Sequence, residues 1–325
     1  MKLLMISTDR KIFEKGSAVA QRQVEYAKKY EEVHIIIFSD KTFTESTIGS
    51  NIWVYPTRSS SKLFYIFDAL KLGKFIAQKR NITHITSQDP FETGLVGVLI
   101  KNKYKAELEL QIHTDIGSPY FQNFTFLNRI RTLISKYTLR KADHVRVVSE
   151  RIKKYVAKYI DESKIEIRPI AIDIEKIANQ STHIDLRQRY PHFSRIILMA
   201  SRLEREKNID MALLAFKIVA DKIPGIGLVI VGKGSEEKRL AKLVIELGIE
   251  KSVIFEGWKD DLSSHYKTCD VFLVSSWYEG YGMTLVEAKS SGARIVSTDV
   301  GVAREMGAVI VGFSPEKIAY GILSL

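Results

Sequence analysis

Two glutamates that are eight residues apart, Glu279 and Glu287, frame a glycine-bearing turn near the end of the chain. The apolar run 270–275 before the turn has the length of a buried strand, and the residues after it read as a helix. Gly280 and Gly282 loosen the backbone where that helix would begin. Because the free N–H groups of a helix N-terminus attract anions, the pattern predicts an anion site between two carboxylates.

A second turn, residues 201–208, offers cations at the same edge of the predicted sheet. Arg202 and Lys207 follow the strand-like run 195–200, and the carboxyl ends of parallel strands share one edge. Arginine can hold a diphosphate with two N–H groups, and lysine adds a point charge. The glycine-bearing turn 232–235 follows the next strand. The three turns together predict a phosphorylated ligand.

The carboxylates suggest what else that ligand carries. Glu287 cannot bind phosphate, but it can accept hydrogen bonds from the vicinal hydroxyls of a ribose, as acidic residues do in dinucleotide folds. Glu279 is placed to contact a second sugar, although a solvated helix face explains a lone glutamate equally well. We therefore expect a nucleotide-diphosphate-sugar. Its diphosphate would contact Arg202, Lys207 and the helix terminus formed by Gly282, Met283 and Thr284.

Strands alternate with helices along the chain, which predicts parallel, doubly wound α/β sheets. The segment 176–193 is polar and lacks periodicity, so we expect it to link an N-terminal domain, 1–175, to a C-terminal domain, 194–325. The first domain is basic, because residues 1–180 contain 30 Lys and Arg against 20 Asp and Glu. The remainder of the chain contains 19 and 18 and is nearly neutral.

Two residues of the first domain lie after predicted strands. Gly16 belongs to a loop between a strand and a helix, which is a weak signal for a phosphate cradle, since such a glycine is more often only a turn. His113 follows the strand 107–112, at the edge where open sheets bind ligands. A loop histidine that hydrogen-bonds locally is the alternative.

The segment 121–141 combines aromatic, aliphatic and basic residues at helical spacing. Helices of this kind lie on membranes, but packing against the core would explain the apolar face equally well. Basic residues continue to 158, so we expect an anionic membrane surface as a partner of 121–158.

The composition is that of a globular protein, with 45% hydrophobic residues and a mean hydropathy of −0.06. No apolar run approaches the roughly 20 residues that span a bilayer, and the N-terminus does not resemble a signal peptide. The single cysteine, Cys269, suits a reducing compartment. We expect a cytoplasmic protein that associates peripherally with the inner face of the membrane.

A family resemblance becomes visible once these motifs are combined. The chain resembles the retaining glycosyltransferases of family 4, most strongly over 198–299, and the segments 88–94 and 148–149 are similar to the family's first domain. The resemblance implies the GT-B architecture, in which two Rossmann-like doubly wound parallel-sheet domains face a central cleft. The residues that carry it are Arg202, Lys207, Asn208, the run Ser275 to Gly282, Glu287, Ala288 and Gly292.

The resemblance also implies the chemistry. A hexose would be transferred with retention by front-face attack, from a UDP-, GDP- or ADP-sugar to a sugar or a lipid-linked acceptor in the synthesis of glycans or cell-envelope polysaccharide. The leaving diphosphate would help to remove the acceptor proton, so neither a metal nor another cofactor is expected. The implied catalytic residues are Glu279, His113, Arg202 and Lys207, with Gly16 near the donor phosphates.

The chain departs from the family pattern in two places. It stops at Leu325 inside an expected helix, which reads as a truncated C-terminus, and its first turn has Gly16-Ser17 instead of a glycine pair. An inactive, glycosyltransferase-like binding or scaffold protein is therefore the alternative function. A nucleic-acid binder is the third hypothesis, but the neutral second half and the lack of a nucleic-acid motif argue against it.

Overall fold

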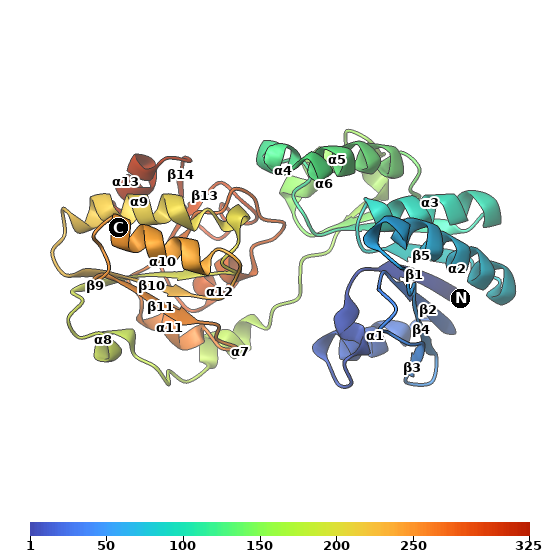
Figure 1. Cartoon of the computed structure of the whole chain (residues 1–325), viewed down its shortest axis with the longest axis horizontal. Helices are drawn as coiled ribbons and strands as arrows, with labels where there is room; N and C mark the ends of the chain where they lie inside the picture. The colour runs from blue at the N-terminus through green and yellow to red at the C-terminus, as the bar shows by residue number, and fades with distance from the viewer. The chain divides into compact units, whose positions relative to one another are not determined.

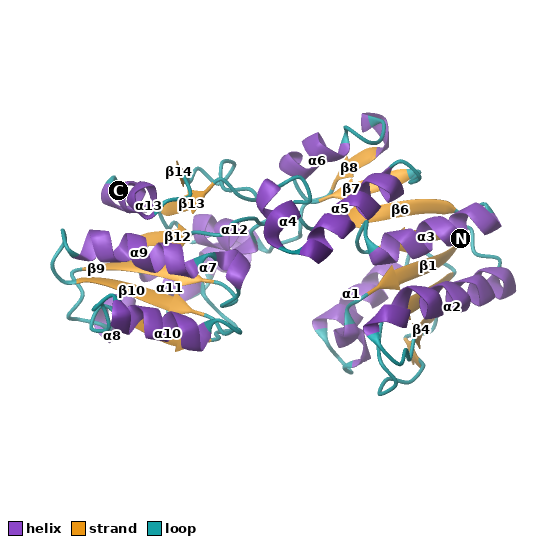
Figure 2. Cartoon of the chain, turned by 45° about the horizontal axis from the view of Figure 1, so that its top comes forward, coloured by secondary structure: helices purple, strands orange, loops and turns teal.

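The computed structural model describes residues 1–325, which form two compact units, Met1–Arg168 and Pro169–Leu325. Each unit is a largely parallel sheet with helices on its faces, as Figures 1 and 2 show. The predicted class, two doubly wound α/β units, is confirmed. None of the helices has the length and apolar character needed to cross a membrane.

The first unit is built on an eight-stranded sheet with the order β3-β4-β2-β1-β5-β6-β7-β8. Only β3 is antiparallel to its neighbour. The elements, with η for 3-10 helices, are β1 (Lys2–Ser7), η1 (Arg10–Phe13), α1 (Ala18–Ala27), β2 (Glu32–Ile37), β3 (Ser46–Ile48), β4 (Ile52–Pro56), η2 (Lys62–Phe64), α2 (Tyr65–Arg80), β5 (His84–Ser87), α3 (Glu92–Tyr104), β6 (Glu107–Ile112), α4 (Pro119–Phe124), α5 (Phe126–Leu139), β7 (His144–Val147), α6 (Glu150–Val156), η3 (Glu162–Lys164) and β8 (Ile165–Ile167).

The second unit contains a six-stranded, fully parallel sheet with the order β11-β10-β9-β12-β13-β14. This is the Rossmann order, with the sequence running outward from β9 in one direction and then outward from β12 in the other. Its elements are α7 (Ile174–Asn179), α8 (Leu186–Arg189), β9 (Arg195–Ala200), η4 (Arg205–Lys207), α9 (Ile209–Ala220), β10 (Ile226–Val231), α10 (Glu237–Glu246), β11 (Val253–Gly257), α11 (Ser263–Thr268), β12 (Val271–Val274), α12 (Met283–Ser290), β13 (Ile295–Thr298), β14 (Val309–Val311) and α13 (Pro315–Leu323).

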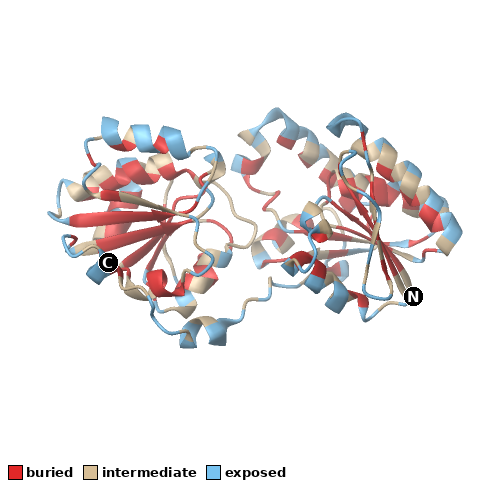
Figure 3. Ribbon diagram, turned by 60° about the horizontal axis from the view of Figure 1, so that its bottom comes forward, coloured by how far each residue is buried: buried red, intermediate tan, exposed pale blue.

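The central strands are buried on both faces, which explains why their sequences are continuous apolar runs. Strands nearer the edges, such as β4 and β7, alternate between buried and more exposed residues. In β9 and β10, which read RIILMA and IGLVIV, only the first residue of β9 is partly exposed. Figure 3 shows the buried central strands of each sheet. Helix α9 covers one face of the second sheet with Ile209, Leu213 and Phe216, whereas α12 covers the other face with Leu285 and Ala288.

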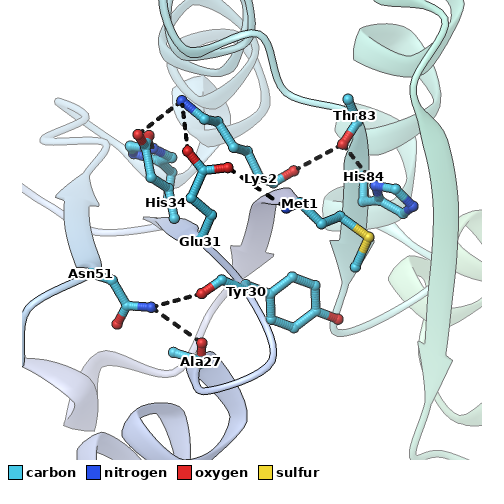
Figure 4. A network of polar contacts seen from close by, with 10 residues as sticks. Met1, Lys2, Ala27, Tyr30, Glu31, His34, Asn51, Thr83 and His84 are labelled. Atoms are coloured by element: carbon cyan, nitrogen blue, oxygen red, sulfur yellow. Dashed lines mark hydrogen bonds and ion pairs between the residues drawn. The ribbon is translucent and has the colours of Figure 1, made fainter.

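Polar contacts tie together the amino ends of β1, β2 and β5 (Figure 4). Lys2 Nζ donates to Glu32 Oε1 at 2.9 Å, and the amino group of Met1 lies 3.7 Å from Glu31 Oε2. Thr83 Oγ1 donates to the carbonyl of Lys2 at 3.5 Å. These contacts lie at the amino ends of the strands. Open α/β sheets bind ligands at the opposite side, at the carboxyl ends of the strands.

The segment 121–141, expected to be one helix, is broken between α4 and α5. Thr125 has an extended backbone, with φ of −142° and ψ of 159°, and its Oγ1 accepts a hydrogen bond from Asn128 N at 3.1 Å. Threonine is a good N-cap because its side chain satisfies a helix donor that has no intrahelical partner. The break was missed because the apolar and basic pattern continues across it.

The segment 176–193, expected to be a linker, contains helical turns and contributes to the core of the second unit. Leu186 in α8 is completely buried among the apolar residues that also pack on α12. Lys267 Nζ donates to the carbonyl of Ala178 at 2.8 Å, which holds α7 in place. The polar composition of the segment gave no sign of this one buried leucine.

The turn after β10 approaches the turn after β9 so closely that it requires a glycine. Gly232 has φ of 149°, and a Cβ atom there would lie 1.8 Å from the carbonyl oxygen of Ser201. We expect Gly232→Ala to lower the free energy of unfolding by more than roughly 3 kcal/mol, because backbone atoms must move apart. Urea unfolding followed by circular dichroism measures this loss.

Gly248→Ala is the matched control, since Gly248 has φ of 65° but open space around its missing Cβ. Only backbone strain of about 1 kcal/mol is expected there. Equal losses for the two variants would contradict the close approach at Gly232.

Candidate functional site

The candidate site lies at the carboxyl ends of β9 and β12, which are neighbours in the second sheet. The chain leaves these two strands toward opposite faces, because α9 packs in one apolar core and α12 in the other. This is the point in a doubly wound sheet at which the strand order reverses. Ligands bind there because the two following helices diverge.

Hydrogen bonds join the turn after β9 to the turn after β12. Asn208 Nδ2 donates to the carbonyl of Ser275 at 3.1 Å, and Ser275 Oγ donates to the carbonyl of Lys207 at 2.9 Å. Trp277 N donates to the carbonyl of Glu206 at 2.9 Å. Asn208 takes the N-cap position of α9, but its side chain reaches across to the neighbouring turn and does not cap the helix.

The two turns also share an ion pair. Lys207 Nζ lies 2.6 Å from Glu279 Oε1, and the two side chains are only 13% and 17% exposed. Ser276 Oγ donates to the same carboxylate oxygen at 2.7 Å. Both contacts are made to Oε1, so Oε2 of Glu279 remains available to a ligand hydroxyl. The cation and the carboxylate that the sequence assigned to one site are therefore in direct contact.

Arg202 occupies the outer rim of the same turn. Its side chain is 64% exposed, and one guanidinium nitrogen lies 2.9 Å from Oε1 of the less exposed Glu206. An exposed pair of this kind is weak, so a phosphate can compete for the guanidinium at little cost. The structure thus places Lys207 inside the turn and Arg202 at its surface.

The N-terminus of α12 carries no side-chain cap. Gly282 takes the N-cap position with φ of 87°, and the first turn contains no acidic residue. The chain stays close to the turn after β13, since Val302 N donates to the carbonyl of Tyr281 at 2.9 Å. The backbone at Met283 and Thr284 therefore begins a helix without an internal anion, as required of an anion site.

Glu287 lies one turn inside α12 and is half-buried. Burial raises the pKa of its carboxyl group, whereas a hydrogen bond from the hydroxyl of Tyr266 to Oε2, at 3.1 Å, opposes that rise. Tyr266 itself is completely buried, so it fixes the direction of the carboxylate. Glu287 and Glu279 therefore lie in different environments although they share one motif.

The third turn, 232–236, packs against the first. Leu203 N donates to the carbonyl of Lys233 at 2.9 Å, and Ser235 Oγ donates to Glu204 Oε2 at 2.7 Å. A Cβ atom at Gly234 would lie 2.2 Å from the carbonyl oxygen of Leu203. Glycine is thus required at Gly232 and Gly234 because the backbones of the two turns approach each other closely.

The remaining predicted site residues, Gly16 and His113, belong to the first unit. Gly16 has φ of 76° and precedes Ser17, whose side chain caps α1. His113 follows β6, and its Nε2 lies 3.4 Å from Gln111 Oε1. Although part of the ring is exposed, the surrounding protein and the guanidinium of Arg146 lower the pKa of His113.

Sequence reasoning missed a polar cluster at the carboxyl end of β11. Desolvation would raise the pKa of the buried Glu256, but hydrogen bonds from His265 at 3.1 Å and Tyr190 at 2.7 Å lower it to about 2. His265 is completely buried as well. The three residues come from separate segments, so no spacing in the sequence could reveal the cluster.

Two family profiles match the chain, one over each half. Residues 23–176 match the profile described as Glycosyltransferase Family 4, and residues 185–318 match Glycosyl transferases group 1. Among curated relatives, the alpha-monoglucosyldiacylglycerol synthase of Streptococcus pneumoniae is 27% identical over 234 residues, which are 68% of this chain and 53% of that protein. The chain spans 40–64% of the length of three such relatives.

Solved structures share the whole fold. Sucrose-phosphate synthase from Thermosynechococcus elongatus superposes with a TM-score of 0.80 at 19% identity, covering 100% of this chain and 89% of that one. Anabaena HepE in complex with UDP-glucose gives a TM-score of 0.68 at 18% identity, with the same coverage. At these identities the likeness concerns the fold, which is the two-unit GT-B architecture.

The contact between Lys207 and Glu279 can be tested by a double-mutant cycle. We expect Lys207→Met and Glu279→Gln each to destabilise the protein, and the double variant to lose less than the sum, because either single change leaves one charge partly buried without its partner. A coupling of about 1–2 kcal/mol is expected from urea unfolding.

The exposed pair Lys242–Glu246 on α10, with side chains 79% and 55% exposed, provides the control cycle. Its coupling should not exceed about 0.5 kcal/mol. If the two cycles gave the same coupling, the ion pair would not hold the two turns together.

Proposed function

The chain belongs to the family 4 glycosyltransferases of GT-B architecture, and we propose that it transfers a hexose, with retention of configuration, from a nucleotide-diphosphate-sugar to a sugar or lipid-linked acceptor. The observation that carries this proposal is the joining of the turns after β9 and β12. It brings Lys207 into contact with Glu279, at the start of the helix that bears Glu287.

The donor would be held in three parts along this edge. The uncapped N-terminus of α12, at Gly282, Met283 and Thr284, suits the diphosphate, with Lys207 and Arg202 supplying positive charge. Glu287, oriented by Tyr266, accepts hydrogen bonds from the ribose hydroxyls. Glu279 retains one carboxylate oxygen for the hexose, while the other oxygen keeps Lys207 and Ser276 in place.

In the proposed reaction, the acceptor oxygen replaces the diphosphate oxygen at the anomeric carbon of the hexose, on the same face of the sugar. The bond to the diphosphate oxygen breaks, the bond to the acceptor oxygen forms, and the acceptor proton passes to the departing diphosphate. Rate comes from stabilising the charge that develops on the diphosphate, which is the role of Lys207, Arg202 and the helix N-terminus. His113, with its lowered pKa, is a neutral hydrogen-bonding group for the transferred sugar at neutral pH.

Relatives support the substrate class. HepE was solved in complex with UDP-glucose, and the pneumococcal relative is by name an alpha-monoglucosyldiacylglycerol synthase. We extend this chemistry to the present chain, which would act at the cytoplasmic face of a membrane in the synthesis of glycans or envelope polysaccharide. The donor class is a UDP-, GDP- or ADP-sugar.

The donor site is tested by three variants. Glu287→Ala and Lys207→Ala should weaken nucleotide-sugar binding roughly ten- to a hundred-fold, because each removes a charged hydrogen-bond partner. Glu279→Ala should reduce kcat more than it raises KM. Thermal-shift screening with UDP-, GDP- and ADP-sugars first identifies the donor, since a ligand of the folded state raises Tm. Calorimetry and initial rates then compare the variants.

Glu250→Ala and Lys251→Ala serve as controls for these variants. Both residues are exposed and precede β11, at the opposite edge of the sheet. They should bind donor and turn over like the wild type. Wild-type behaviour of all three site variants would contradict the proposed site, and the absence of any nucleotide-sugar effect on Tm would favour an inactive binding protein.

The stereochemistry and the metal requirement are tested together. We expect proton NMR of the first product formed to show the anomeric configuration of the donor, because attack and departure occur on one face. Treatment with EDTA should leave the rate unchanged. An inverted product, or a rate that is lost with EDTA and restored by a divalent cation, would overturn the corresponding part of the mechanism.

A further inference from the structure

Helix α5 faces the protein with its polar side and the solvent with its apolar side. Its buried residues are mostly polar, and the apolar residues Phe126, Leu133 and Tyr137 are 78%, 66% and 43% exposed. A surface helix normally shows the reverse arrangement. Packing against the core, the alternative explanation for the apolar residues of segment 121–141, therefore applies to the buried Phe121 of α4 but not to the apolar face of α5. The buried residues are Asn128, Thr132, Ser135, Thr138 and Leu139.

The exposed apolar residues form one continuous stripe. Phe126, Ile130, Leu133 and Tyr137 occupy positions i, i+4, i+7 and i+11, which lie on one face of a helix. Leu127, 48% exposed, widens the stripe at its start. Isolated exposed apolar residues are ordinary, but a stripe of this length on one helix marks an interaction surface.

Specific hydrogen bonds fix the helix in this orientation. Asn128 Nδ2 donates to the carbonyl of Phe121 at 3.0 Å, and Thr138 Oγ1 donates to the carbonyl of Pro90 at 2.6 Å. Arg131 Nε donates to Glu92 Oε1 at 2.9 Å from the side of the helix. Rotating α5 to bury its stripe would break these bonds, so the outward apolar face is a built feature.

Basic residues flank the stripe. Arg129 and Arg140 are exposed, and Lys136 lies on the same side of the helix. Between residues 126 and 158 the chain contains ten Lys and Arg but only two acidic residues, Asp143 and Glu150. Asp143 is already paired with Lys101 at 2.6 Å. The segment 126–158 thus has a strongly positive net charge, and Glu92, the carboxylate that contacts α5, is paired with Arg131.

We propose that α5 lies in the interface of an anionic lipid bilayer, with Phe126, Ile130, Leu133 and Tyr137 inserted between the lipids and Arg129, Lys136 and Arg140 contacting the phosphates. The occupant follows from the two properties together. An apolar stripe alone would fit a groove on another protein. A stripe bordered by basic side chains fits the boundary between the acyl chains and the anionic headgroups of a bilayer. Long basic side chains can reach the headgroups while their stems lie along the apolar surface.

This binding requires neither donor nor acceptor, so it stands apart from the proposed glycosyl transfer. It can therefore be measured on the full chain without an activity assay. A failure of vesicle binding would leave the donor site untouched, and an inactive enzyme would leave vesicle binding unchanged.

The experiment is co-sedimentation with sucrose-loaded vesicles made of phosphatidylcholine alone or of an equimolar mixture with phosphatidylglycerol. We expect the wild type to bind the anionic vesicles preferentially. Ile130→Ser combined with Leu133→Ser should lower the partition coefficient roughly ten-fold or more, because it removes the centre of the stripe. Arg129→Gln combined with Arg140→Gln should reduce binding to anionic vesicles and its dependence on salt.

The matched control removes exposed apolar side chains from the second unit. Ile245 and Tyr320 are 68% and 75% exposed, and Ile245→Ser combined with Tyr320→Ser should bind vesicles like the wild type. Because the substituted residues are exposed, each variant should keep its Tm. As a direct readout, Leu133→Trp should show a blue-shifted emission with anionic vesicles and quenching by brominated lipids.

Three results would overturn the proposal. Unchanged vesicle binding by the Ile130→Ser, Leu133→Ser variant would show that α5 is not the binding element. The exposed Leu63, Phe67 and Phe75 of η2 and α2 would then be the next apolar residues to substitute. An unshifted Leu133→Trp emission in the presence of bound vesicles would show that α5 stays in water. Concentration-dependent dimerisation that disappears in the same variant, without vesicle binding, would assign the stripe to a second copy of the chain.

Discussion

The adjacency of β9 and β12 is the constraint from which the second unit's chemistry follows. The chain runs outward from β9 through β10 to β11, returns to the centre, and runs outward again from β12. The helices that follow β9 and β12 must therefore cover opposite faces, and their N-termini diverge. The turns that precede them, 201–208 and 275–282, remain side by side. Hydrogen bonds between Asn208, Ser275 and Lys207 convert this neighbourhood into a fixed geometry.

The two carboxylates of the site, Glu279 and Glu287, lie in different electrostatic environments. Glu279 is compensated by Lys207 and by a serine hydroxyl, so its charge is balanced before any ligand arrives. Glu287 has only a tyrosine hydroxyl as its partner, and burial raises the pKa of its carboxyl group. In the proposed function, the diphosphate would contact Lys207 while Oε1 of Glu279 keeps this lysine in place, and Oε2 is left for the hexose. Binding of the leaving group and positioning of the sugar would then depend on the same ion pair.

The first unit contributes a different kind of surface. Its sheet resembles the second in winding, but the outer side of α5 is apolar and basic where a surface helix is normally polar. The helix is held by the side chains of Asn128 and Thr138 on its inner face, so the apolar side chains on the outer face are exposed. In the proposed function, docking of α5 to a bilayer would confine the search for a lipid-linked acceptor to two dimensions.

The sequence alone determined the winding of both sheets and predicted most residues of the candidate donor site, because these depend on local patterns. Continuous apolar runs such as those of β9 and β10 specify buried parallel strands, and glycines next to helix starts mark the turns between them. The motif from Glu279 to Glu287 could be recognised because its members are close in sequence. Only the tertiary structure decided the contact between Lys207 and Glu279, which are 72 residues apart, and the hydrogen bond from Tyr266 to Glu287.

The sequence likewise could not predict which face of α5 packs against the protein. Periodicity shows that a helix has an apolar side, but not which side meets the protein, since that depends on partners such as Pro90 and Glu92 from a distant turn. The buried Leu186 and the cluster of Glu256, His265 and Tyr190 escaped prediction for the same reason. Local residues set which elements form, whereas contacts between distant segments set which side chains face one another.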